Sequence, residues 1–291
     1  MSQLERILLP IDFSAQSEIA ARQAGALARR FHSQVTLFHV SDFMLVHPLT
    51  GPLGFGITPP EALHAEYLSS RQKALNEFGK AALEGVNVRR MVCRGDPAQL
   101  IVERARAERS DLIVMPTHGH GALRRFLLGS VTAKVLHDAE CPVWTGTHLA
   151  DAPAADPAQI RHVMCAVNFG PQSQAVIQWA ADFASEFGAD LTIVHSVLET
   201  PPNLPERYMF QWHEEAEWGT QEQLRTLLLD SGIKADAMVA SDADVTKAIC
   251  SAAQQKGADV LVIGRSCARD RKLGTHTYAI ICQAPCPVVS V

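Results

Sequence analysis

The chain has 291 residues, which exceeds an ordinary single domain and is enough for two domains that each bury a core. Hydrophobic residues make up 47% and charged residues 20%, which excludes a disordered or fibrous protein. The net charge of −5 argues against a broad basic surface, so no nucleic-acid partner is expected.

The N-terminal segment and the cysteines indicate a compartment. The apolar run in MSQLERILLPIDFS is far shorter than the core of a signal peptide, and no run approaches membrane-spanning length. The seven cysteines are scattered and contain no CxxC pair, which is typical of proteins from a reducing environment. We therefore expect a cytoplasmic protein without membrane insertion.

The first strands and helix of the chain are predicted from its opening residues. RILLPI (6–11) is a short apolar strand, and Ser14 is placed to cap a helix that runs to Phe31 with apolar residues at helical spacing. VTLFHV (35–40) is the second strand.

The middle of the first half continues the alternation. A helix is expected to begin at Pro60 and to end near Gly85, before a third strand, VNVRRMV (86–92). Asp96 and the proline after it begin another helix. DLIVM (111–115) is an unbroken apolar run, which suits a central strand covered on both faces.

The sequence then repeats itself. ILLPIDFS (7–14) aligns with VMCAVNFG (163–170), and FHSQVTLFHVSD (31–42) aligns with FGADLTIVHSVL (187–198). SDLIVM and ECPVWT, later in the first half, match ADVLVI and PCPVVS in the second, in the same order. The chain is therefore predicted to hold two copies of one domain.

We place the first domain at 1–149 and the second at 160–291, with an Ala-, Pro- and Asp-rich linker at 150–159. Strands alternate with helices in each copy, which predicts an α/β fold of two tandem, five-stranded, doubly wound parallel sheets. In such sheets a ligand binds beyond the carboxyl ends of the strands, where the strand order reverses.

Several residues at those ends favour an anionic ligand. Asp12 follows the first strand, Val40 ends the second, and the segment 115–136 follows the fourth. Within that segment Gly129 and Ser130 precede a helix, whose free N–H groups and dipole attract anionic oxygens. Isolated glycines more often mark simple turns, so the combination carries the interpretation.

With these residues the chain resembles the universal stress protein family over nearly its full length. Nucleotide-binding members carry G-x-x-G, nine residues and then G-[ST] after the fourth strand, and this chain has Gly119, nine residues and Gly129-Ser130. The family's DFS after the first strand and HV after the second are also present. Pro116 stands where the family has its first glycine, which removes an N–H and fixes φ.

The resemblance implies that the N-terminal domain binds ATP or ADP, with Mg²⁺ accompanying the nucleotide. Asp12 and the Val40 backbone would hold the adenosine end, while the glycines and hydroxyls of the later segment would hold the ribose and phosphates. The candidate nucleotide-binding set is Pro10, Ile11, Asp12, Val40, Met115, Thr117, His118, Gly119, Gly129, Ser130, Val131 and Thr132. His118 and His120 lack a third ligand in the sequence, so no metal site is assigned. No catalytic residue is assigned either.

Three functions remain open at this point. The first is an ATP-binding stress-response or signalling protein whose nucleotide alters its binding of a protein partner. The second is a nucleotide-free protein that binds a small molecule or serves in assembly. The third is a slow ATPase, which is less favoured because the sequence has no Walker lysine and no evident general base aimed at a phosphate.

The second copy departs from the nucleotide-binding pattern. Its loop keeps Gly264, but Cys267 replaces the second glycine and only six residues precede Gly274-Thr275. Asn168 replaces the carboxylate of Asp12. We therefore expect this copy not to bind ATP as the family does.

The last strand of each copy, PVWTG (142–146) and PVVSV (287–291), is short, apolar and expected at a sheet edge. Such strands resemble the family's dimer-forming elements, which implies halves facing each other about a pseudo-twofold axis, and a homodimer of whole chains. His39 and His195 end their strands without an evident partner and are expected to be structural.

Overall fold

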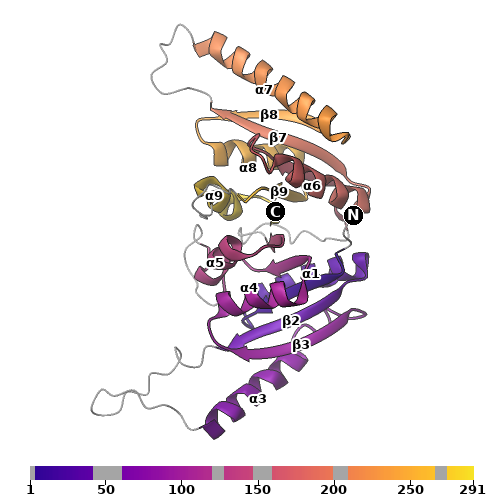
Figure 1. Cartoon of the computed structure of the whole chain (residues 1–291), viewed down its shortest axis with the longest axis vertical. Coiled ribbons are helices and arrows are strands. Elements are labelled where there is room, and N and C mark those ends of the chain that lie inside the picture. Colours follow the sequence, from indigo (N-terminus) through magenta and orange to yellow (C-terminus); the bar gives the residue numbers. More distant parts are fainter. Residues whose placement is uncertain (1–3, 42–60, 120–127, 147–158, 199–208, 266–273) are drawn as a thin grey trace, which may run out of the picture. The chain divides into compact units, whose positions relative to one another are not determined.

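The computed structural model describes residues 4–41, 61–119, 128–146, 159–198, 209–265 and 274–291 (Figure 1). The described residues divide into two compact units. Residues 4–119 and 129–143 form the first, and residues from 144 onward form the second together with Leu128.

The first repeat alternates strands and helices in chain order. Its elements are β1 (Arg6–Ile11), α1 (Ala15–Phe31), β2 (Gln34–Ser41), α3 (Glu61–Glu77), β3 (Asn87–Arg94), α4 (Pro97–Glu108), β4 (Leu112–Met115), α5 (Ser130–Asp138) and β5 (Val143–Thr145). The strands lie in the order β3-β2-β1-β4-β5, and β1 pairs in parallel with both β2 and β4. The strand order reverses at β1, so the switch point lies between β1 and β4.

The second repeat has the same architecture. Its elements are β6 (His162–Ala166), α6 (Ser173–Phe187), β7 (Asp190–Leu198), α7 (Met209–Ser231), β8 (Asp236–Asp242), α8 (Val245–Lys256), β9 (Val260–Ile263), α9 (Thr275–Gln283) and β10 (Val288–Ser290). The strands lie in the order β10-β9-β6-β7-β8, with β6 parallel to β7 and β9. The predicted pair of doubly wound parallel sheets is confirmed.

Local sequence signals set the ends of several helices. The Ser14 side chain accepts a hydrogen bond from the Ser17 N–H at 3.2 Å, which caps α1 as predicted. Asp96 caps α4 in the same way through the Gln99 N–H at 2.8 Å. None of the described helices is long and apolar enough to cross a membrane.

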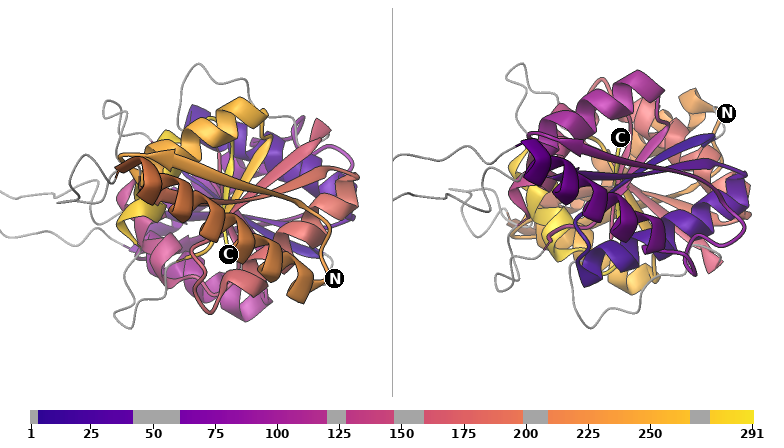
Figure 2. Two further views of the ribbon diagram at one scale, coloured as in Figure 1. Left: turned by 90° about the horizontal axis from the view of Figure 1, so that it is seen from above. Right: turned by 90° about the horizontal axis from the view of Figure 1, so that it is seen from below.

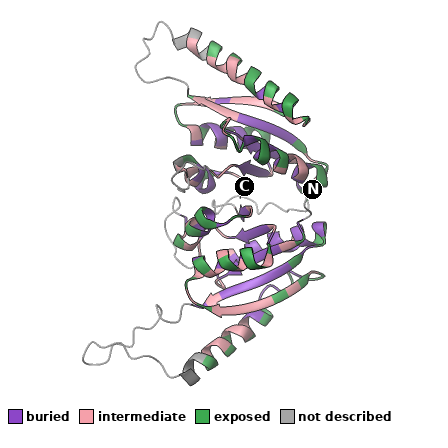
Figure 3. Cartoon of the chain, viewed as in Figure 1, coloured by how far each residue is buried: buried purple, intermediate pink, exposed green. Residues whose placement is uncertain are grey.

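The central strands carry the core of each unit. All four residues of β4 and all four of β9 are buried, as expected for strands covered on both faces (Figure 3). Strands β3 and β8 are more exposed, and a helix lies along each of them, α3 beside β3 and α7 beside β8 (Figure 2).

The predicted end of α3 is wrong. The helix ends at Glu77, and turns rather than helix continue to Gly85. Gly79 adopts φ 66°, a left-handed conformation that stops a helix. Phe78 and Leu83 are nevertheless buried, so apolar residues continue after the helix has ended. These residues explain why the sequence predicted a longer helix.

Candidate functional site

Asp12 is held firmly at the carboxyl end of β1. Its Oδ1 accepts hydrogen bonds from the Ser14 N–H at 3.0 Å and from the Ser17 hydroxyl at 2.7 Å. The backbone N–H of Asp12 donates to the Ser17 oxygen at 3.1 Å. The carboxylate is therefore fixed in orientation by the first turn of α1.

The segment after β4 passes directly against this carboxylate. A Cβ placed on Gly119 would lie 1.9 Å from Asp12 Oδ2, far closer than any real contact. Only glycine allows the backbone to approach so closely. The structure thus brings together two predicted site residues that are more than a hundred positions apart in the chain.

The start of α5 is tied to the same segment. The Gly129 N–H donates to the Thr117 carbonyl at 2.8 Å, and the Thr132 hydroxyl donates to the Pro116 carbonyl at 2.9 Å. Pro116, which lacks an N–H, still contributes its carbonyl to this arrangement. Thr132 is buried, so its hydroxyl positions the loop.

The first N–H groups of α5 are available to a ligand by the geometry of the helix. Ser130, Val131 and Thr132 occupy the first turn, where backbone N–H groups have no intrahelical acceptor. No side chain caps this helix, because the residue before it is Gly129. Ser130 itself is exposed. This helix start can donate several hydrogen bonds to an anion.

The remaining predicted residues line the ends of the strands. Ile11 is buried at the end of β1, and its carbonyl bonds the His39 ring. Val40 lies one position before the end of the neighbouring strand β2 and is partly exposed. Met115 ends β4, and Thr117 is buried with its hydroxyl 3.1 Å from His118 Nδ1. Pro10 pairs with Phe38 inside the sheet.

Phe13, the residue after Asp12, forms a ring pair with His39 that the sequence did not predict. Phe13 adopts φ 64°, unusual for a residue with a side chain, and its ring centroid lies 4.6 Å from that of His39. The guanidinium of Arg71, on α3, lies 5.7 Å from the Phe13 ring centroid. The second repeat contains the same pair, Phe169 and His195, at 4.3 Å.

This ring pair could have been found by aligning the two repeats, because Phe13 aligns with Phe169 and His39 aligns with His195.

Burial lowers the pKa of His39, and nearby Arg71 lowers it further, while the hydrogen bond to the Ile11 carbonyl and Asp12 oppose the shift. The His39 ring is therefore held neutral as a structural donor, in keeping with the role expected for it.

Some sequence-based expectations fall outside the described residues. His120 and Cys267 are among them, as is most of the expected linker.

A sequence model of the universal stress protein family matches this chain twice, at residues 3–145 and 159–291. The chain belongs to the universal stress protein family. Universal stress protein MJ0531 of Methanocaldococcus jannaschii is 38% identical over 144 residues, which cover 48% of this chain and 79% of that protein. A universal stress protein of Mycolicibacterium smegmatis is 27% identical over 216 residues, covering 73% of this chain and 70% of that protein.

Solved structures agree on the fold of this universal stress protein. A universal stress protein from Archaeoglobus fulgidus matches with a TM-score of 0.68 at 20% identity, covering 99% of this chain and 96% of that one.

The second universal stress protein repeat keeps the geometry of the helix start but not the residue that matches Asp12. Gly274 precedes α9 with φ −59° and ψ 142°, nearly the values of Gly129, −58° and 144°. At the other end of the site, Asn168 is exposed and its Oδ1 accepts from the Gly170 N–H at 3.0 Å. The buried Ser173 hydroxyl, which corresponds to that of Ser17, has no hydrogen-bond partner among the described residues.

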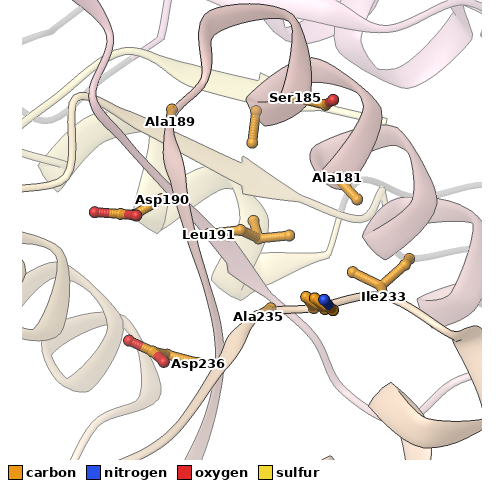
Figure 4. A pocket seen from close by; sticks show the side chains of 10 residues that line it. Ala181, Ser185, Ala189, Asp190, Leu191, Ile233, Ala235 and Asp236 are labelled. Atoms are coloured by element: carbon orange, nitrogen blue, oxygen red, sulfur yellow. The ribbon is translucent and has the colours of Figure 1, made fainter.

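A hollow of roughly 680 Å³ in the second unit lies elsewhere (Figure 4). Asp190 and Asp236, the first residues of β7 and β8, are among its lining residues, with Lys234 and apolar side chains of α6. It therefore lies at the amino ends of the strands, opposite to the ends where doubly wound folds bind their ligands.

Proposed function

We propose that this universal stress protein binds ATP or ADP at the carboxyl ends of β1 and β4 in its first unit. The close approach of Gly119 to Asp12, where a Cβ would lie 1.9 Å from the carboxylate, carries the proposal. This approach brings Asp12, expected to bind the adenosine end of the nucleotide, next to the segment expected to bind its phosphates. The approach lies at the carboxyl ends of β1 and β4, where doubly wound folds bind their ligands.

The adenosine end would use fixed hydrogen-bonding groups. Asp12 is oriented by Ser14 and Ser17, and its carboxylate is a strong acceptor for an N–H or hydroxyl of the nucleoside. Val40, one position before the end of the adjacent strand β2, would offer backbone groups to the base. An acceptor that is already oriented loses little entropy when the ligand binds.

The phosphate end would use the start of α5. The free N–H groups of its first turn and the helix dipole favour negative charge. Mg²⁺ would accompany the phosphates of the nucleotide and neutralise part of their charge.

The site favours binding over catalysis. Asp12 already accepts two hydrogen bonds, and the His39 ring donates to the Ile11 carbonyl. These hydrogen bonds hold both groups in place to bind and orient a nucleotide, and neither group is aimed at a phosphate as a general base. We therefore propose a role in which nucleotide occupancy alters the binding of a partner protein in stress response or signalling.

Calorimetric titration of ATP and ADP into the full chain tests the proposal. The Gly129→Glu variant introduces a negative charge where phosphates would lie. The position tolerates a side chain, because the nearest atom to an added Cβ is 3.4 Å away. We expect binding to be lost while the circular dichroism and thermal unfolding stay close to those of the wild type.

Gly274→Glu is the matched control, since Gly274 has the same backbone conformation in the second repeat. We expect it to bind ATP as the wild type does. Unchanged affinity in a folded Gly129→Glu protein would reject the assignment of the site.

A further inference from the structure

Helix α7 of the second unit exposes two large apolar side chains. Trp218 is 72% exposed and Leu229 is 80% exposed. Figure 3 shows a run of exposed positions along this helix. A different side of the helix packs on the sheet, because Leu224 and Leu228 are buried and α7 contacts β7 and β8. The exposed side chains therefore stand on a helix that is anchored to the sheet.

Trp218 and Leu229 lie on the same face of α7. They are eleven residues apart, which is close to three full turns of an α-helix. Glu222 and Arg225 fall between them on that face, and both are exposed. We call these four residues, Trp218, Glu222, Arg225 and Leu229, the α7 stripe.

The spacing of the α7 stripe is that of a coiled-coil seam. Its residues follow one another at intervals of four, three and four, the alternation of a and d positions in heptads. Glu222 and Arg225 form an exposed ion pair within the chain at 3.4 Å. Such a pair contributes little in water and exchanges partners at small cost.

The α7 stripe is complementary to a second α7 stripe that runs in the opposite direction. Trp218 precedes Glu222 by four residues, and Leu229 follows Arg225 by four. Reversing the direction of the helix therefore exchanges Trp218 with Leu229 and Glu222 with Arg225. A surface that is its own complement under a twofold rotation is what an isologous dimer contact requires.

We propose that the α7 stripe is a self-association surface that binds the α7 stripe of a second copy of this chain in antiparallel orientation. Trp218 of each copy packs on Leu229 of the other, and Glu222 pairs with Arg225 of the other. A parallel arrangement is disfavoured, because it would oppose glutamate to glutamate and arginine to arginine.

The contact is expected to be weak and reversible. One helix face buries less than the roughly 1,200 Å² below which interfaces are usually transient. The charged centre sets the direction and register of the two helices, as polar residues do in coiled-coil seams. This association does not depend on nucleotide binding in the first unit.

Charge substitutions test the proposal by sedimentation velocity over a range of protein concentrations. Glu222→Arg places arginine opposite the partner's Arg225, and Arg225→Glu places glutamate opposite the partner's Glu222. Each single variant should associate more than about tenfold more weakly than the wild type. The double variant, Glu222→Arg with Arg225→Glu, should restore association.

A mixture of the two single variants is the most specific arm. The Glu222→Arg chain carries two arginines at the centre of its stripe and the Arg225→Glu chain carries two glutamates, so an equimolar mixture should associate although neither component does alone. Asp230→Arg is the matched control. It makes the same charge change at an exposed position of α7 away from the stripe, and should leave association unchanged.

Several results would overturn the proposal. One is a wild-type chain that shows no concentration-dependent association. Another is association that neither single variant weakens, which would mean that a different surface forms the contact. Failure of both the mixture and the double variant to recover association would also reject the antiparallel pairing. The substituted side chains are exposed, so circular dichroism should confirm an unchanged fold in every variant.

Discussion

At the scale of single residues, Gly119 is the position where the site allows no side chain. An alanine Cβ there would lie 1.9 Å from Asp12 Oδ2. The carboxylate cannot turn away without breaking its hydrogen bonds to Ser14 and Ser17. We predict that Gly119→Ala lowers the free energy of unfolding by about 1–3 kcal/mol and weakens ATP binding, measured by urea denaturation and calorimetry.

The reason for that loss can be isolated by a double-mutant cycle. If the clash is with the carboxylate, Gly119→Ala should cost less in an Asp12→Ala background than in the wild type. Gly129→Ala is a matched control, because its nearest neighbour would be 3.4 Å away and its φ is −58°. Additive effects of Gly119→Ala and Asp12→Ala would contradict the contact.

His39 predicts a pH dependence of stability. Burial, with a further contribution from Arg71, lowers its pKa below the ordinary value of 6.5, although the Ile11 carbonyl and Asp12 oppose the shift. The unfolded chain therefore binds the proton more readily. The contribution of His39 is complete above pH 6.5 and is lost as the pH falls from 6.5 toward the folded pKa, by at most about 1.4 kcal/mol per pH unit.

Urea denaturation at several pH values between 5 and 8 measures this effect. His195 has a pKa lowered by burial as well, so each histidine is replaced by glutamine separately. Each variant should show a shallower fall in stability on acidification than the wild type. An identical pH profile in His39→Gln would mean that this ring does not resist protonation.

The residues of the candidate site were predictable where a local pattern marks them. Asp12 follows an apolar strand, and Gly129 precedes a helix, so both belong to patterns that are readable along the chain. The ring pair of Phe13 and His39 was not found, because it depends on a positive φ and on packing between neighbouring strands. Such contacts have no signature within a short window of sequence.

At the scale of elements, α7 contains a glycine that its packing does not require. A Cβ on Gly219 would meet no atom within 4 Å among the described residues. Glycine in a helix interior costs roughly 0.5–1 kcal/mol relative to alanine, so Gly219→Ala should stabilise the chain by about that amount in thermal or urea unfolding.

Gly79→Ala provides the contrasting case. Gly79 has φ 66°, and an alanine in the left-handed region costs about 1–2 kcal/mol, so this variant should be less stable than the wild type. The same glycine explains why the end of α3 was misplaced from the sequence. An isolated glycine in an apolar pattern can be tolerated within a helix, and only its observed φ reveals that it ends this one.

At the scale of the whole molecule, the fold could be predicted because the chain contains two copies of one domain that can be aligned with each other. Matching segments such as 7–14 and 163–170 identify the strands twice, and chance periodicity rarely repeats in the same order. The differences between the two copies fall at residues of the candidate nucleotide site. The second repeat keeps the helix start at Gly274 but replaces Asp12 by Asn168.

We predict that one chain holds one adenine nucleotide, in its first unit. Native mass spectrometry of the full chain with saturating ATP and Mg²⁺ measures this most directly, because it counts the ligands on each chain. The predicted result is a single added nucleotide per chain, which disappears in the Gly129→Glu variant and persists in Gly274→Glu. Two nucleotides per chain, or one that survives Gly129→Glu, would show that the first unit is not the single nucleotide site.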